Sequence, residues 1–186
     1  MTENVVIKPF KFNNSLDSNL ILELNTKFAN KIVPKVGLCL CIWDLTKIEK
    51  CFISSGDGSI SVRVYFRMVV FKPFLDEVLT GSVKSCSKKG VYITLGFFDD
   101  IIIPPEKLRH PSRYDPDQEC WIWEYAYEEE SADLKIEKND LIRFKVANEL
   151  WNDPNPNDPT CQKDIPPYRI IGSIIADGLG LTCWWS

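Results

Sequence analysis

The segment from Gly81 to Ile103 limits the possible folds of this chain more than any other. It reads GSVKSCSKKGVYITLGFFDDIII, and its alternation of β-branched, aromatic and small residues predicts three short strands, at 81–85, 91–95 and 100–103. A tight turn at 88–90 joins the first two strands. A curled strand, a basic turn with a glycine and a strand carrying an aromatic residue are typical of the first half of a five-stranded OB barrel. Such barrels commonly bind oligonucleotides, so the segment predicts a nucleic-acid-binding module.

The rest of the second half continues the barrel. Residues 152–167 contain five prolines and predict a flexible loop. Further strands are predicted at 120–127, 134–136, 141–147, 168–176 and 179–185.

The first half reads as a compact α+β unit. Apolar residues recur every four positions over 16–32, which predicts an amphipathic helix, and Asn14 or Ser15 is expected to cap its start. The strand at 36–45 is apolar on both faces, so we expect it in the centre of a covered sheet. Strands are predicted around the helix at 5–12, 36–45, 51–53 and 62–71.

The two predicted domains, 1–79 and 80–186, differ in charge. The first carries 10 Lys and Arg against 8 Asp and Glu, and the second carries 12 against 18. A protein that grips duplex DNA through its phosphates is basic overall. Any contact with nucleic acid is therefore expected to be local.

Composition argues against several functional classes. No apolar run approaches the ~20 residues that cross a bilayer, and the N-terminal ten residues lack the pattern of a signal peptide. We therefore expect no membrane contact and a cytosolic or nuclear setting. The seven cysteines form no C-x-x-C pair and His110 is the only histidine, so neither a metal site nor a catalytic set is expected. We predict no cofactor and no enzymatic activity.

Several segments together resemble one protein family. They are VGLCLCIWDLTKIE, SSGDGS, FRMVVFKPFLDEVLTGSVKSCSKKGVYITLGFFDDIIIPPEKL, WIWEY and the terminal GSIIADGLGLTCWW. In this order, and over nearly the whole chain, they are similar to the larger subunit of the stalk heterodimer of multisubunit DNA-directed RNA polymerases. FFDDIIIPPE and GLGLTCWW resemble the RNA polymerase III version in particular.

The resemblance implies a fold and a set of partners. The fold would be an N-terminal tip domain, with an RNP-like or ferredoxin-like sheet and one main helix, followed by an all-β S1-type OB barrel. The partners would be a smaller stalk subunit, the polymerase core, nascent RNA and initiation factors, all in the nucleus. The chain departs from many S1 repeats at Lys89 and Ile103, where an aromatic residue and a histidine are usual.

The basic turn and its neighbours are candidates for weak RNA contact. Alternation places Lys84 on the face opposite Val83, and the turn reaches solvent. One stacked base contributes ~1–3 kcal/mol, so few aromatic residues predict weak, sequence-tolerant binding. The alternative is a solvated turn with Tyr92 filling the barrel. The candidate residues are Lys84, Lys88, Lys89, Tyr92 and Phe98.

The segment from Ser54 to Ser59 predicts a hairpin turn, because glycine permits a positive φ and Asp tolerates one. By the resemblance, it is also the tip loop that docks on the polymerase core. The docking residues would be Ser55, Gly56, Asp57 and Gly58.

An aromatic stripe recurs at every second residue of one predicted strand, at Trp121, Trp123, Tyr125 and Tyr127. A strand places all four on one face. Neighbouring glutamates repel phosphates, so packing is favoured over base stacking, either inside this chain or onto the smaller stalk subunit. Of the two C-terminal tryptophans, one is expected to close the barrel and the other, Trp185, to meet the partner.

Three functions fit these features to different degrees. A non-catalytic stalk subunit of RNA polymerase III explains most of them. The alternatives are the equivalent subunit of another nuclear polymerase and a free-standing S1-type RNA-binding protein. The last explains the barrel but neither the helix-plus-sheet first half nor the aromatic stripe.

Overall fold

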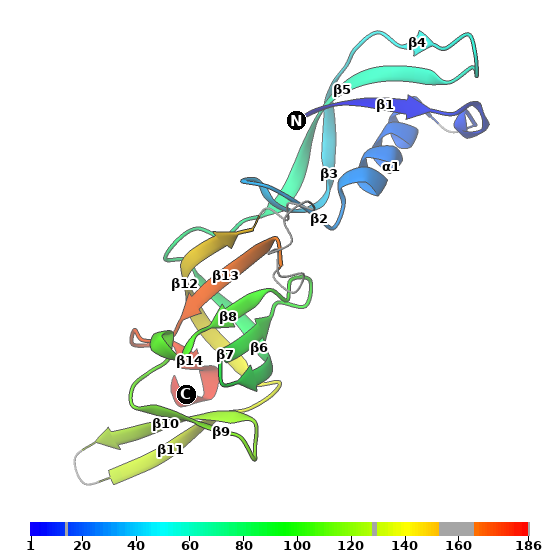
Figure 1. The fold of residues 1–186 in the computed structure, drawn as a ribbon. Coiled ribbons are helices and arrows are strands. Elements are labelled where there is room, and N and C mark those ends of the chain that lie inside the picture. Colours follow the sequence, from blue (N-terminus) through cyan, green and yellow to red (C-terminus); the bar gives the residue numbers. More distant parts are fainter. Residues whose placement is uncertain (14, 128–129, 153–165, 186) are drawn as a thin grey trace. The chain divides into compact units, whose positions relative to one another are not determined.

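The computed structural model describes residues 1–13, 15–127, 130–152 and 166–185. The chain divides into two compact units, Met1–Lys72 and Pro73–Ser186, which we call the tip unit and the barrel unit (Figure 1). The predicted loop at 152–167 lies almost entirely outside the described residues. No helix in the described part of the chain is long and apolar enough to cross a membrane.

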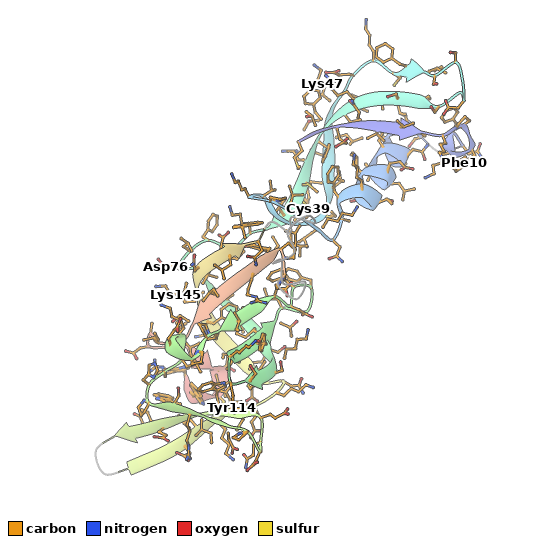
Figure 2. All side chains as sticks on the ribbon, in the orientation of Figure 1. Phe10, Cys39, Lys47, Asp76, Tyr114 and Lys145 are labelled. Atoms are coloured by element: carbon orange, nitrogen blue, oxygen red, sulfur yellow. The ribbon has the colours of Figure 1, made fainter. Side chains whose placement is uncertain are left out.

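The division between the units precedes the expected boundary at residue 79. The turn that follows Pro73 belongs with the barrel unit, because it hydrogen-bonds to a barrel strand. The Asp76 N–H donates to the Val146 carbonyl, and the Val146 N–H donates to the Glu77 carbonyl, each at 2.8 Å. Figure 2 labels Asp76 beside Lys145, with which it forms an ion pair at 2.7 Å.

The tip unit consists of one α-helix packed on an antiparallel sheet (Figure 1). The strand order is β1-β5-β3-β2, and β4 also pairs with β5. The elements are β1 (Thr2–Ile7), the 3-10 turn η1 (Pro9–Lys11), α1 (Leu16–Phe28), β2 (Lys31–Val33), β3 (Gly37–Ile48), β4 (Phe52–Ile53) and β5 (Ile60–Phe71). The core between α1 and the sheet comprises Val5, Ile7, Leu20, Leu24, Ile42, Val62, Val64 and Phe66.

Helix α1 forms where the sequence predicted it. The Ser15 hydroxyl accepts a hydrogen bond from the Ser18 N–H at 3.3 Å, which satisfies one free donor of the first turn. Leu20 and Leu24 lie one turn apart and are fully buried against the sheet. The predicted helix and its apolar face are therefore confirmed.

Two expectations for the tip unit are wrong. The helix ends at Phe28 rather than at residue 32, because Lys31–Val33 form β2 and pair with β3. Strand β3 is not covered on both faces, since Cys41 is exposed and Trp43 is 69% exposed. Its apolar residues therefore do not all mark a core position.

Five strands close a barrel in the barrel unit. The pairing order is β13-β8-β7-β6-β12, and β12 pairs back with β13, which closes the sheet. The β8–β13 pairing is parallel, whereas the other barrel pairings are antiparallel. The strands are β6 (Val78–Ser87), β7 (Gly90–Thr94), β8 (Ile101–Ile103), β12 (Leu141–Trp151) and β13 (Tyr168–Ser173). An α+β unit followed by a closed β-barrel is thus confirmed.

A second, three-stranded sheet is inserted between β8 and β12. The 3-10 turn η2 (Pro105–Lys107) leads into it, and its order is β11-β10-β9. The strands are β9 (Ser112–Asp115), β10 (Cys120–Tyr127) and β11 (Glu130–Ile136). We call this the outer sheet, and Figure 1 shows β10 and β11 extending away from the barrel. The sequence predicted β10 and β11, but it described the residues of β9 as irregular.

The C-terminal segment differs from the strand expected at 179–185. Only β14 (Gly180–Leu181) pairs with β12, and Thr182–Trp185 form the 3-10 turn η3. Gly180 has φ +109°, and a Cβ there would lie 2.4 Å from the Trp184 ring. The chain therefore turns back on itself at this glycine. Any other residue at this position would displace Trp184.

Candidate nucleic-acid interface and docking surfaces

The basic turn joins β6 to β7 and presents two lysines to solvent. Lys88 and Lys89 are both exposed, and neither forms an ion pair with another described residue. Gly90 follows with φ +135°, and a Cβ on it would lie 2.1 Å from the Ile103 carbonyl oxygen. Only glycine allows β7 to approach the end of β8 this closely.

Lys84 lies on β6, the strand that leads into the basic turn, but it already forms an ion pair. The pairing of β6 with β7 shifts register between Val83 and Ser85, so Lys84 lies at a bulge. Val83 is buried and Lys84 exposed, as alternation predicted. The Lys84 ammonium lies 2.9 Å from an Asp99 carboxylate oxygen.

Two groups hold the Asp99 carboxylate in its ionised form. The Thr94 hydroxyl donates to one of its oxygens, and Lys84 contacts the other. The Thr94 hydrogen bond and then the Lys84 hydrogen bond lower the pKa of Asp99 below its usual value. The neighbouring Asp100 behaves differently, because burial raises its pKa.

The two aromatic candidates near the turn differ in exposure. Tyr92 is half-buried on β7, opposite Ser85 and Ile102. Phe98 is only 4% exposed and packs against the Tyr168 ring, with centroids 5.6 Å apart. The prediction that Phe98 contacts RNA is therefore wrong, because its ring fills the core while that of Phe97 is 52% exposed.

The predicted hairpin turn lies between β4 and β5 and holds its own shape. The Ser54 N–H donates to the Ser59 carbonyl at 2.8 Å, and the Gly58 N–H donates to the Ser54 carbonyl at 2.9 Å. One Asp57 oxygen accepts from both the hydroxyl and the N–H of Ser59, at 2.7 and 3.1 Å. These bonds, with the Ser59 hydroxyl first, lower the pKa of Asp57. Ser55, Gly56 and Asp57 are exposed, so the turn is a rigid projection.

Large apolar side chains adjoin this turn, and the sequence analysis did not single them out. Phe52 and Ile53 of β4 are 70% and 74% exposed, and Phe10 of η1 is 70% exposed. Figure 2 labels Phe10. A Cβ at Gly58 would lie 3.4 Å from a carbon of Pro9, so η1 lies beside the turn. The apolar residues of this short strand are visible in the sequence, but apolar residues in a predicted strand are normally expected to lie in the core.

Two residues of the aromatic stripe on β10 pack inside this chain. Trp121 and Trp123 are 6% and 9% exposed. The Trp121 indole N–H donates to the Ser87 carbonyl at 2.9 Å, and its ring lies 5.6 Å from that of Tyr114. Of the two alternatives for the stripe, packing inside this chain therefore holds for these two tryptophans, and their assignment to packing onto a partner is wrong, because the chain itself covers them.

Tyr125 of the stripe and the two C-terminal tryptophans are less deeply buried. Tyr125 is 39% exposed, and its ring packs roughly perpendicular to that of Trp123, with centroids 5.1 Å apart. Trp185 is 46% exposed, whereas Trp184 is half-buried and lies 5.2 Å from Trp123. The side chain of Tyr127 lies outside the described part of the chain.

Arg109 organises this aromatic region, although nothing in its sequence context indicated so. Its guanidinium lies 4.9 Å from the Trp123 ring centroid and 5.1 Å from that of Trp185. It also donates to the Ala176 carbonyl at 2.8 Å and to Asp177 at 2.9 Å. Its side chain is 12% exposed. Arg109 thus fastens the C-terminal turn η3 to the outer sheet.

Comparison with known proteins first defines a class for the tip unit. Residues 2–58 match the model of the SHS2 domain found in the N terminus of Rpb7p, Rpc25p and MJ0397. Residues 77–185 match the model of RNA polymerase III subunit Rpc25. The two matches cover both units in order.

Individual relatives agree with these models over the full length. The chain is 43% identical to DNA-directed RNA polymerase III subunit RPC8 of Bos taurus, over 100% of this chain and 96% of that protein. It is 38% identical to RPC8 of Saccharomyces cerevisiae, over 97% and 95%, and 34% identical to the RNA polymerase II subunit RPB7 of that yeast, over 95% and 94%. The chain belongs to the RNA polymerase III subunit Rpc25 family, which confirms the resemblance found in its sequence.

Proposed function

We propose that this chain is the larger, non-catalytic stalk subunit of RNA polymerase III and works in the nucleus. The observation that carries the proposal is the match of the whole chain to subunits that bear this polymerase's name. Identity to the yeast RNA polymerase III subunit exceeds identity to the RNA polymerase II counterpart, 38% against 34%. This favours polymerase III over the alternative of another nuclear polymerase.

The barrel is proposed to be an S1-type OB domain. Its five strands close through one parallel pairing, β8 with β13, and otherwise through antiparallel pairings. The three N-terminal strands follow one another through short turns, and the outer sheet is inserted before the fourth. This arrangement agrees with the Greek-key barrel of OB folds.

The OB domain is proposed to contact nascent RNA weakly and without sequence preference. Lys88 and Lys89 offer two exposed charges, Lys84 a third that is shared with Asp99, and Tyr92 a partly exposed ring. A stacked base contributes about 1–3 kcal/mol and each phosphate contact is screened by salt. A surface of this size suits a transcript that must keep moving.

The tip unit is proposed to dock on the polymerase core through the 54–59 turn. Exposed Phe10, Phe52 and Ile53 beside it add apolar area of the kind that anchors interfaces. Tyr125 and Trp185 remain the candidates for contact with the smaller stalk subunit, because both keep exposed ring area. Phosphodiester chemistry would remain with other subunits of the polymerase.

A purification from nuclear extract tests the proposal. The chain is tagged at its N-terminus, recovered at native abundance, and its partners are identified by mass spectrometry. We expect polymerase III subunits and one small partner in a stoichiometric complex. Recovery of polymerase II subunits would indicate that the chain is a subunit of another nuclear polymerase. Recovery of only ribosomal or RNA-decay proteins would overturn the proposal in favour of a free-standing RNA-binding protein.

A further inference from the structure

The ion pair between Lys84 and Asp99 bears on how tightly the proposed RNA surface binds. The Lys84 ammonium is the only one of the three candidate lysines that contacts a carboxylate among the described residues, at 2.9 Å. Both side chains of the pair are about half exposed, at 52% and 50%. A phosphate oxygen that approaches Lys84 from solvent therefore meets a lysine whose charge is already balanced.

The position of Asp99 is fixed by the fold rather than by Lys84 alone. The Leu95 N–H donates to the Phe98 carbonyl at 2.9 Å, which closes the turn after β7. Phe98 is buried in the core directly before Asp99, and Gly96 takes the positive φ of +87° that the turn requires. Asp99 is therefore anchored on one side by a core aromatic residue.

Thr94 completes this arrangement from the neighbouring strand. Its hydroxyl donates to Asp99 and also accepts from the Gly96 N–H at 2.9 Å. The carboxylate that faces Lys84 is thus held by a hydroxyl of defined orientation. Because this hydrogen bond and the lysine both favour the anion, the carboxylate stays charged at neutral pH.

Asp100 adds a second negative group within electrostatic reach of Lys84. It is half-buried, and its charge also interacts with Arg169, so it is a less direct partner. Lys88 and Lys89 stand apart from both aspartates in the basic turn and have no carboxylate contact of their own in the described chain. The three lysines are therefore not equivalent.

We infer that Asp99 is a built-in competitor of RNA phosphate for Lys84, and that it limits the RNA affinity of the barrel unit. The inference rests on the proposed RNA contact and adds a residue that sets its strength. A carboxylate and a phosphate oxygen both form charge-assisted hydrogen bonds to an ammonium, and Asp99 competes because it already occupies one of the three N–H donors of Lys84 and balances its charge. Asp99 would thus keep the affinity of the barrel unit for the transcript low.

The test uses the stalk heterodimer, co-expressed with its smaller subunit, and a fluorescently labelled oligouridylate of about 16 nucleotides, the upper end of the site size of one OB fold. Asp99→Asn removes the charge and keeps an oxygen that accepts from Thr94. We expect RNA affinity, measured by fluorescence anisotropy, to rise about two- to fivefold, because exposed pairs of this kind interact weakly. The dependence of affinity on salt should steepen by up to roughly one phosphate contact.

Asp133→Asn is the matched control. Asp133 lies 2.7 Å from Arg113 in the outer sheet and is 52% exposed, so the two variants remove the same charge from pairs of similar geometry and exposure. We expect the control to change RNA affinity less than Asp99→Asn. Asp99→Glu, which keeps the charge, should remain close to wild type.

A double-mutant cycle with Lys84→Gln decides whether Asp99 acts through that lysine. In the Lys84→Gln background, Asp99→Asn should give little further gain. An equal gain with and without Lys84, or an equal gain in the Asp133 control, would overturn the inference and leave only a general charge effect. If Asp99→Asn lowers the thermal stability of the heterodimer, Asp99→Ser repeats the measurement with a smaller side chain.

Failure of the inference and failure of the proposed RNA contact give different results. If replacing Lys84, Lys88 and Lys89 together by Gln weakens binding but Asp99→Asn leaves it unchanged, the competitor role is refuted and the RNA surface stands. If the triple lysine variant binds as tightly as wild type, the RNA surface itself is refuted.

Discussion

Replacing Arg109 by Ala should destabilise the barrel unit by several kilocalories per mole. Each of its two indole contacts contributes roughly 0.5–2 kcal/mol, with the upper value for desolvated groups. The charged hydrogen bond to the Ala176 carbonyl adds about 1.5–3 kcal/mol. The contact with Asp177 adds little, because that carboxylate is 96% exposed.

Part of this gain is offset in the wild type. The guanidinium gives up its hydration at 12% exposure, and its Nε has no hydrogen-bond partner in the described chain. The net loss on truncation is therefore about 2–4 kcal/mol, the same order as other large losses from buried polar networks. For a domain of this size, ~3 kcal/mol lowers the melting temperature by about 10 °C.

Tryptophan fluorescence measures this loss selectively. Five of the six tryptophans lie in the barrel unit, so the unfolding of full-length protein in urea or on heating reports mainly on that unit. Arg109→Lys keeps the charge but lacks the planar group, so it should lose most of the stabilisation that Arg109 contributes. Asp177→Asn is the control and should be nearly neutral. An Arg109→Ala variant that melts within ~2 °C of wild type, less than a 1 kcal/mol change, would refute the stabilising role of the contacts between Arg109 and the rings of Trp123 and Trp185.

Three further predictions concern other sites. Gly90→Ala should unfold the barrel or greatly lower its melting temperature, because its Cβ would lie 2.1 Å from the Ile103 carbonyl oxygen; circular dichroism on heating checks this. Tyr168→Phe should be neutral or stabilising by up to ~1 kcal/mol in urea unfolding, since its buried hydroxyl has no partner in the described chain. Deleting 56–58 should release the stalk from purified polymerase while leaving it folded, and stoichiometric co-purification of this variant would argue against tip docking.

The sequence predicted those parts of the fold that depend on local pattern. Leu20 and Leu24 occupy one helical face, and the alternation around Val83 and Ile93 marks barrel strands whose inward side chains are indeed buried. These assignments succeed because residue spacing fixes which side chains share a face. The tip loop is equally local, since its glycines and Asp57 determine the turn.

The errors arise where tertiary contacts decide. Phe97 and Phe98 are adjacent and chemically alike, so only the turn after β7 determines that Phe98 enters the core. Trp121 and Trp123 form a stripe that would suit a partner equally well until the outer sheet packs them against Ser87 of the barrel and Trp184 of the C-terminal turn. Arg109 is an ordinary loop arginine in the sequence, because its partners come from β10 and the C-terminus.

The charge of the barrel unit, which the sequence analysis weighed against RNA contact, is unevenly placed. Residues 112–140 carry 3 Lys and Arg against 10 Asp and Glu, so they account for the whole acidic excess of 80–186. This segment is joined to the basic turn, because the Trp121 indole donates to the Ser87 carbonyl directly before Lys88. At the ~8 Å screening length of physiological salt the lysines act locally, whereas at low salt the acidic sheet also repels phosphate. Affinity for RNA should therefore rise less steeply on dilution of salt than for a free-standing basic OB protein, which is the behaviour of a guiding surface rather than a storage site.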